Sequence, residues 1–380
     1  MLIGVQFTCM PLQKIRSKIA SSKVHTWYGK YERLISSFSL VFGFAFDALL
    51  LKRVDMFWEN MWVIGHLVIV AVCMTLIHRI KGEPGDEANP DKPHFWLVNV
   101  IQFFFGGLIS VFLVFYFRSA DLSISWPFIL ILALVFWANE SLKRRFVRLN
   151  FQISLFFLSV FLCAIYIVPV FIHQIGAWVF ILSGIISLAI TIPFLRILSW
   201  ASGAEFQKNK NKITFWISAI FAVMNIFYFT NIIPPIPLSL KDSGIFYSLT
   251  KDSNGNYTAS YEDSDWKGYL TFSPGIYLAS GDTVYAYSAV FSPTSLNTTI
   301  VHLWQYYDEY AKSWVDETRV ELPVIGGRDK GFRTYSAISG LTSGNWRVNV
   351  ETLRGQVIGR LRFTVIFGKS PQAPKIKILD

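Results

Sequence analysis

The chain changes its physical character within residues Ile213–Leu240, which read ITFWISAIFAVMNIFYFTNIIPPIPLSL. The first part of this stretch is a long apolar run. The second part contains Pro234, Pro235 and Pro237, which end a helix and stiffen the chain. No later segment has an apolar run long enough to cross a bilayer. The sequence therefore predicts a polytopic membrane protein that carries one soluble domain at its C-terminus.

Seven apolar stretches precede this boundary, separated by short polar loops. A helix needs about 20 apolar residues to cross ~30 Å of hydrocarbon, and most of these stretches qualify. The fourth is the weakest, because its uninterrupted apolar core is only Trp126–Ala138. We predict an α-helical transmembrane bundle of about seven helices, which span approximately Leu34–Leu51, Phe57–Ile77, Phe95–Phe117, Ile124–Leu142, Ile153–Ile172, Ile175–Leu195 and Ile213–Ile233.

Basic residues are distributed unevenly over the predicted loops. The N-terminal segment and the second, fourth and sixth loops contain 17 Lys and Arg, whereas the opposite loops contain 3, namely Lys52, Arg53 and Arg118. Because cytoplasmic loops carry an excess of basic residues, we expect a cytoplasmic N-terminus. After seven crossings the C-terminal domain is then outside, which in a bacterium would mean periplasmic or extracellular.

The composition and motifs exclude several classes of function. The net charge of +10 does not indicate a nucleic-acid partner, because residues 240–380 hold 15 Lys and Arg against 14 Asp and Glu. The basic excess belongs to the membrane half, whose expected partner is the lipid bilayer. The sequence contains no nucleophile elbow, zinc-binding motif or phosphate-binding glycine loop. We therefore predict no catalytic residue, no metal and no cofactor, and we favour a non-enzymatic protein.

The C-terminal region has the alternation of β-strands, with turn residues between the strands. In the last strand Leu361 and Phe363 share one face, which should be core, while Arg360 and Arg362 share the wet face. These features predict an all-β, immunoglobulin-like sandwich. Alternation is clearest at Tyr285–Phe291, Thr299–Tyr307, Thr318–Val324, Trp346–Val350 and Val357–Phe367.

The predicted organisation has five parts. They are a basic cytoplasmic segment (1–33), the seven-helix domain (34–233), a proline-rich linker (234–241), the exported β-sandwich (242–368) and an extended tail (369–380).

Ionisable residues within predicted membrane helices are the first candidates for function. Asp47 lies near the end of the first helix, and His66 lies about 13 Å into the second at 1.5 Å per residue. Arg53 and Asp55 follow in the connecting loop. Two interpretations remain open. The charges could pin the first two helices together, with Asp47 bonded to Arg53 or to a helix end, or Asp47 and His66 could form a proton- or ion-handling site.

One predicted strand of the exported domain has an unusual face. His302, Trp304 and Tyr306 alternate with Val301 and Leu303. If the aliphatic residues point inward, the other three form an exposed polar and aromatic stripe with side chains about 7 Å apart. Such a stripe could stack on sugar rings or on a partner protein, with charge added by the arginines of the last strand. Alternatively, Trp304 packs in the core and His302 is held by hydrogen bonds.

Several short motifs resemble a known bacterial family. The runs VHLW (Val301–Trp304), RTYS (Arg333–Ser336), GNWRVNV (Gly344–Val350) and GQVIGRLRF (Gly355–Phe363) resemble domain-of-unknown-function family 2914. The runs YER (31–33), GFAFD (43–47) and RVD (53–55) are similar to the start of its polytopic membrane version. The resemblance implies a bacterial inner-membrane protein with this domain at its C-terminus, and it implies no activity.

Three interpretations of the function follow from these observations. In the first, the exported sandwich of a non-enzymatic membrane protein binds a partner protein or an envelope glycan. In the second, a membrane-embedded enzyme or proton-linked transporter acts on a lipid-linked or envelope substrate through Asp47 and His66. The third interpretation is a proton-linked sensor.

Overall fold

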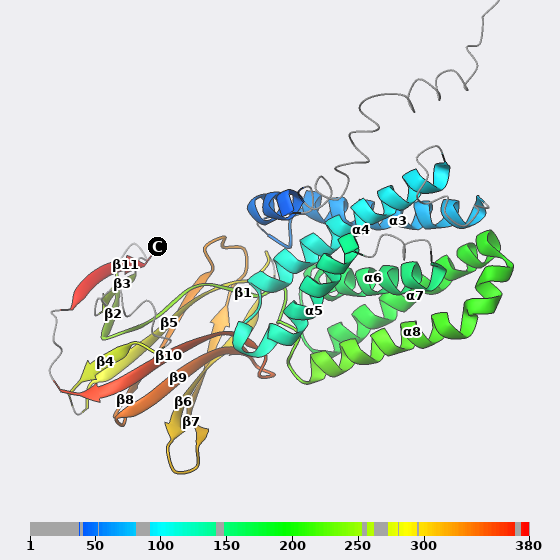
Figure 1. Ribbon diagram of the computed structural model, residues 1–380. Helices are drawn as coiled ribbons and strands as arrows, with labels where there is room; N and C mark the ends of the chain where they lie inside the picture. The colour runs from blue at the N-terminus through cyan, green and yellow to red at the C-terminus, as the bar shows by residue number, and fades with distance from the viewer. Residues whose placement is uncertain are drawn as a thin grey trace, which may run out of the picture.

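The computed structural model describes residues 38, 41–51, 53–80, 92–141, 148–252, 257–261, 273–279, 281–294, 296–368 and 374–379. A bundle of helices forms the first part of the chain and a β domain forms the second, and the two parts meet end to end (Figure 1). The predicted fold class, a helical bundle followed by an all-β domain, is confirmed.

Seven helices of the described residues make up the bundle, and six of them are long and apolar enough to cross a membrane. The first is described over Val41–Leu50, and most of its predicted beginning lies outside the described residues. The last begins nine residues before its predicted start at Ile213, because Glu, Gln and Lys are good helix formers. The six long helices are α3 (Phe57–Arg79), α4 (Pro93–Arg118), α5 (Leu122–Ser141), α6 (Leu149–Ile172), α7 (Ala177–Ser202) and α8 (Ala204–Phe229).

Burial and tryptophan positions are those of a membrane-spanning bundle. The most apolar segments of α4 and α6 are 67% and 72% buried, against 17% for α8, so α4 and α6 form its centre. Exposed tryptophans lie toward both ends, with Trp58, Trp126 and Trp178 at one end and Trp96 and Trp200 at the other. About 33 Å of helix separates the two tryptophans of α7. Such aromatic belts are typical of the two membrane interfaces.

The helices alternate in direction, so the bundle has two chemically different ends. At the end remote from the β domain, His78 Nε2 lies 2.9 Å from Gln152 Oε1, and its Nδ1 lies 3.4 Å from Glu205 Oε2. The Arg79 guanidinium lies 4.3 Å from the centroid of the Trp200 ring. The helix ends that lead into the predicted cytoplasmic loops lie at this remote end. The segments 53–56, 119–121, 173–176 and 230–238 lie at the end that faces the β domain (Figure 1).

Three sheets make up the described part of the β domain. The first, in spatial order, contains β1 (Ser239–Phe246), β5 (Thr283–Phe291) and β8 (Phe332–Ser339). The second contains β4 (Gly275–Leu278), β10 (Val357–Phe367), β9 (Gly344–Thr352), β6 (Thr298–Asp308) and β7 (Ser313–Val324). The third contains β11 (Lys375–Leu379), β3 (Tyr257–Tyr261) and β2 (Ser248–Lys251).

The main core of the domain lies between the first and second sheets, as predicted for a sandwich. Val284 of β5, Val348 of β9 and Phe363 of β10 are fully buried there. Alternation turns Tyr287 and Ala289 of β5 to the other side, where they pack against the third sheet. The strand β5 is therefore buried on both faces, and the third sheet adds a layer that the sequence does not predict.

Two segments outside the predicted sandwich belong to the β domain. The strand β1 begins at Ser239, inside the segment 234–241 that was expected to be a linker, and it pairs with β5. The strand β11 lies in the expected tail 369–380 and pairs with β3. Both strands are short, and only Leu379 of β11 is buried, so their membership depends on backbone pairing more than on hydrophobic pattern.

Candidate functional site

The predicted exposed stripe on β6 is wrong, because His302 and Trp304 are fully buried in the sandwich core. The face that carries them turns toward the first sheet, where serines satisfy their polar atoms. His302 Nε2 lies 2.8 Å from Ser288 Oγ, and its Nδ1 lies 2.9 Å from Ser336 Oγ. Trp304 Nε1 donates to Ser336 Oγ at 2.9 Å. Buried polar groups with such partners are stable, so these side chains belong to the core, and Tyr306 is half-buried beside them.

The role of His302 is to join the two sheets. Burial lowers the pKa of His302 to about 4, so the imidazole is neutral at pH 7. Its partners come from β5 and β8, and Thr334 of β8 extends the network with a hydroxyl 3.1 Å from Ser288 Oγ. A neutral imidazole enclosed by hydrogen bonds and closed to solvent offers nothing to a ligand.

The opposite face of the second sheet carries the arginines of β9 and β10. Arg360 and Arg362 are half-buried on this outward face, as predicted. The register places Arg362 directly opposite Arg347 of β9, and Arg347 lies opposite Gln305 of β6 on its other side. We call the surface formed by Arg347, Arg360 and Arg362 the arginine face.

The arginine face makes its hydrogen bonds to neutral groups. Arg347 Nε donates to Gln305 Oε1 at 2.6 Å. Arg360 Nη1 donates to Ser123 Oγ at 3.0 Å, which connects the face to the start of α5. Within the described residues, no salt bridge joins Arg347, Arg360 or Arg362 to a carboxylate. Among the described residues the three guanidinium groups therefore have no ion-pair partner, although the charges of Asp121 and Asp316 act on Arg347 from a longer distance.

Unpaired cations in close proximity make this face a candidate anion-binding site. Burial and repulsion by Arg360 and Arg362 lower the pKa of Arg347 to about 10. Burial also lowers the pKa of Arg360, although the Asp121 carboxylate opposes this effect. Like charges directly opposite each other destabilise a sheet, and an anion between them would remove the repulsion. Guanidinium groups bind carboxylate, sulfate or phosphate through paired hydrogen bonds.

Aromatic side chains lie beside the arginine face. The Arg347 guanidinium lies 4.2 Å from the centroid of the Trp314 ring of β7, and Trp314 packs edge-on against Tyr307 at 5.3 Å. Tyr310, in the turn between β6 and β7, is fully exposed. Our sequence reasoning missed Arg347 and Trp314. Arg347 could have been found, because strand alternation turns it away from the core residue Trp346.

The structure brings together two of the predicted membrane residues. Asp47 accepts a hydrogen bond from Ser110 Oγ of α4 at 2.6 Å. His66 is buried on α3, with Nδ1 2.8 Å from the Trp62 carbonyl oxygen. Asp47 and His66 are near enough for their charges to interact. The sequence did not indicate Ser110, which is an ordinary small residue in an apolar helix.

Arg53 and Asp55 bind the β domain, so the expected bond between Asp47 and Arg53 is wrong. Arg53 Nη2 lies 2.6 Å from Asp55 Oδ2, and Arg53 also forms a salt bridge with Asp329 in the turn before β8. The Thr294 backbone N–H donates to Asp55 Oδ2 at 3.0 Å. Burial opposes the charged form of Asp55, but the bonds from Arg53 and Thr294 outweigh it and lower its pKa. Arg53 and Asp55 therefore hold the loop between the first helix and α3 against the β-sandwich.

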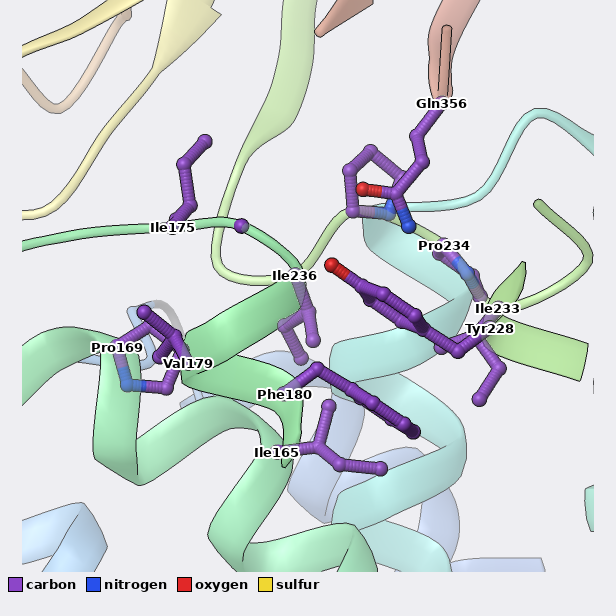
Figure 2. A pocket seen from close by; sticks show the side chains of 12 residues that line it. Ile165, Pro169, Ile175, Val179, Phe180, Tyr228, Ile233, Pro234, Ile236 and Gln356 are labelled. Atoms are coloured by element: carbon purple, nitrogen blue, oxygen red, sulfur yellow. The ribbon is translucent and has the colours of Figure 1, made fainter. Parts of the chain in front are cut away.

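A small cavity lies where the bundle meets the β domain, and Figure 2 shows its lining. The Phe180 and Tyr228 rings stack beside it, with centroids 3.8 Å apart. Gln356 Nε2 is buried there without a hydrogen-bond partner among the described residues. The volume of about 30 Å³ suits one or two water molecules and is far too small for an organic ligand. The cavity is therefore a feature of the contact between the two parts, not a ligand site.

The helices, the tryptophan belts and the terminal sandwich define an integral membrane protein with a folded domain at one end of its bundle. Residues 297–365 match the family described as "Protein of unknown function (DUF2914)". The match lies in the C-terminal part of the chain, in agreement with the resemblance of its motifs. The matched residues run from β6 to β10 and include the arginine face.

Other comparisons add no functional information. No curated protein matches the chain. An immunoglobulin-like protein from Pseudomonas aeruginosa is 13% identical, with a TM-score of 0.22; the match covers 34% of this chain and 98% of that one. A Pseudomonas fluorescens alkylpurine DNA glycosylase bound to DNA is 10% identical, with a TM-score of 0.22 and coverage of 82% and 99%. Similarities at this TM-score support no argument about what the chain does.

Proposed function

We propose that this is a non-enzymatic membrane protein whose β domain binds an anionic glycan of the cell envelope at the arginine face. The observation that supports the proposal is the opposition of Arg347 and Arg362, which have no carboxylate partner among the described residues. A sheet that keeps two guanidinium groups face to face loses stability unless an anion neutralises them. The acidic groups of a glycan would supply that anion.

The geometry of the face suits a chain of acidic sugars. Neighbouring strands lie about 4.8 Å apart, and residues two apart on one strand lie about 7 Å apart. Positive charge is therefore spaced across the strands, from Arg347 to Arg362, and along β10, from Arg362 to Arg360. The Trp314 and Tyr307 rings beside them offer flat apolar surfaces on which sugar rings stack. A ligand with both negative charge and ring faces would use every part of this surface.

The position of the face also agrees with a ligand at the membrane surface. The bond from Arg360 to Ser123 holds the face beside the first turn of α5, at the end of the bundle. If the uneven distribution of basic loop residues orients the chain as expected, this end is outside the cytoplasm. The protein would then sit in a bacterial inner membrane and present the arginine face to the envelope.

The proposal is tested by measuring the binding of full-length protein in detergent to polygalacturonate, with neutral dextran as the comparison. Arg362→Ala is expected to weaken binding about tenfold or more, because a charge-assisted hydrogen bond contributes ~1.5–3 kcal/mol. The Arg362 side chain makes no hydrogen bond or salt bridge among the described residues, so the fold should be unchanged. Lys377→Ala, at an exposed cation on β11, is the matched control and should bind normally.

Two results would overturn the proposal. The first is equal binding of polygalacturonate and dextran, which would remove the role of charge. The second is binding that Arg362→Ala leaves unchanged. If neither polysaccharide binds, and a photo-crosslinker at position 362 captures a protein in cells, the ligand is a partner protein and the glycan assignment is wrong.

A further inference from the structure

A second polar site lies inside the helical bundle and is independent of glycan binding. Ser110, which holds Asp47, is buried eight residues before the end of α4, about 12 Å along the helix from Arg118. No Lys or Arg forms a salt bridge with Asp47 among the described residues. Arg118 instead donates to the carbonyl oxygens of Ala48 and Leu51 and so caps the end of the first helix. Among the described residues the Asp47 carboxylate therefore has no fixed counter-ion.

His66 presents an unused ring nitrogen in the same region. Its Nδ1 lies 2.8 Å from the Trp62 carbonyl oxygen, which can only accept, so Nδ1 carries a hydrogen. In the neutral ring Nε2 then carries a lone pair, and Nε2 has no hydrogen-bond partner among the described residues. The Trp62 and Phe104 rings pack against the imidazole with centroids 4.7 and 4.8 Å away. The ring is thus held in one orientation while Nε2 stays available.

The helix α4 brings the two groups together. Gly107 faces the His66 ring, and a Cβ at this position would lie 3.0 Å from Nε2. Ser110 bonds Asp47 three residues later, and residues at this spacing lie on the same face of a helix. The charges of Asp47 and His66 are close enough to interact. One face of α4 therefore contacts both the Asp47 carboxylate and the His66 imidazole within the bundle.

We propose that Asp47 and His66 form one proton-binding site inside the bundle, with Ser110 and Gly107 as positioning residues. A proton from water binds the lone pair of His66 Nε2, and the resulting imidazolium is stabilised by the Asp47 carboxylate. No redox step or co-reactant is needed. Before protonation the site carries the single negative charge of Asp47, and after protonation its net charge is zero, so the bundle responds to proton concentration. Other charged or titratable groups on the packed elements include Glu59, Cys73, His78 and Arg79 of α3, His94, Tyr116 and Arg118 of α4, Cys163 and Tyr166 of α6, and Arg53 and Asp55 of the loop before α3.

The test is a pH titration of full-length protein in detergent, with ¹³C-labelled histidine observed by NMR. His66→Gln identifies the His66 signal by its loss. In the native protein this signal should move as the pH is changed. Asp47→Asn removes the neighbouring negative charge, so His66 should take up its proton at a lower pH than in the native protein. The His302 signal, from the core of the β domain, is the internal control and should behave in the same way in the native protein and in Asp47→Asn.

A second variant keeps the proposal testable if Asp47→Asn does not fold. Gly107→Ala leaves both charges in place and fills the space at Nε2, so it should shift the His66 signal and leave that of His302 unchanged. A His66 signal that is independent of pH would overturn the proposal. A titration midpoint that is the same in the native protein and in Asp47→Asn would overturn it as well. Neither result bears on glycan binding, which depends on residues of the β domain.

Discussion

Acidification is expected to destabilise the β domain through His302. The pKa of His302 is about 4 in the folded domain, whereas an ordinary imidazole titrates near 6.5. Between these two values the unfolded chain binds more protons than the folded chain does. The free energy of unfolding therefore falls as the pH falls from 6.5 to about 4. Above pH 6.5 the imidazole is neutral in both the folded and the unfolded state, so His302 causes no pH-dependent loss of stability.

The expected size of the effect follows from the separation of the two values. Each pH unit corresponds to about 1.4 kcal/mol, so the descent from 6.5 to about 4 removes roughly 3 kcal/mol. This is a large share of the ~5–15 kcal/mol that stabilises a typical domain. The cause is physical, because an imidazolium at this site would be charged, cut off from water and held between Ser288 and Ser336.

The assay is urea unfolding of residues 239–380, followed by circular dichroism from pH 7 to pH 4. Because the main core lies between the domain's own sheets, we expect this fragment to fold alone as a monomer. His302→Gln should be less stable at pH 7. Its free energy of unfolding should lack the part of the pH dependence that comes from the titration of His302. The stability gap between the two proteins should therefore narrow by about 3 kcal/mol on acidification. Parallel losses of stability in both proteins would refute this reasoning.

Three further predictions concern the core, the first hairpin and the topology. Trp304→Ala should cost about 3–5 kcal/mol in the same unfolding assay, and an unchanged urea midpoint would contradict its burial. Asp47→Ala should lower the yield of folded full-length protein. In a double-mutant cycle this defect should couple to Ser110→Ala and not to Arg53→Ala, and equal coupling to both would dispute the observed contacts. Reporter fusions after residues 90 and 205 should be cytoplasmic, and those after Arg118 and at the C-terminus should be exported; a cytoplasmic C-terminus would show that the orientation is wrong.

Much of the architecture could be predicted because it depends on local hydrophobicity. A run of apolar residues as long as a bilayer is thick must form a helix in the membrane, since its backbone polar groups have no other partners there. The observed helices α3 to α6 therefore begin and end within four residues of their predicted spans. In the same way, strict alternation in Val357–Phe367 predicted β10 with the correct bounds and its two arginines outward.

The choice of face on β6 could not be predicted. Both faces contain large or apolar side chains, and Ile300, Val301 and Trp304 are all fully buried. What turns His302 and Trp304 inward is the pair of serines on β5 and β8, which are distant in sequence and adjacent only after the sheets pack. A polar side chain is stable in the core only where it finds a hydrogen-bond partner, and the sequence does not show where that partner lies.

The amino-acid sequence by itself determined the class of protein, the approximate spans of α3 to α6 and the position of the soluble domain, because each depends on the polarity of neighbouring residues. Only the tertiary structure decided which functional groups meet. Arg347 faces Arg362 through the register of two strands, and Ser110 meets Asp47 through the packing of two helices. Such contacts join residues 15 and 63 positions apart in the sequence, and their geometry is set when backbone pairing and side-chain packing bring those positions together.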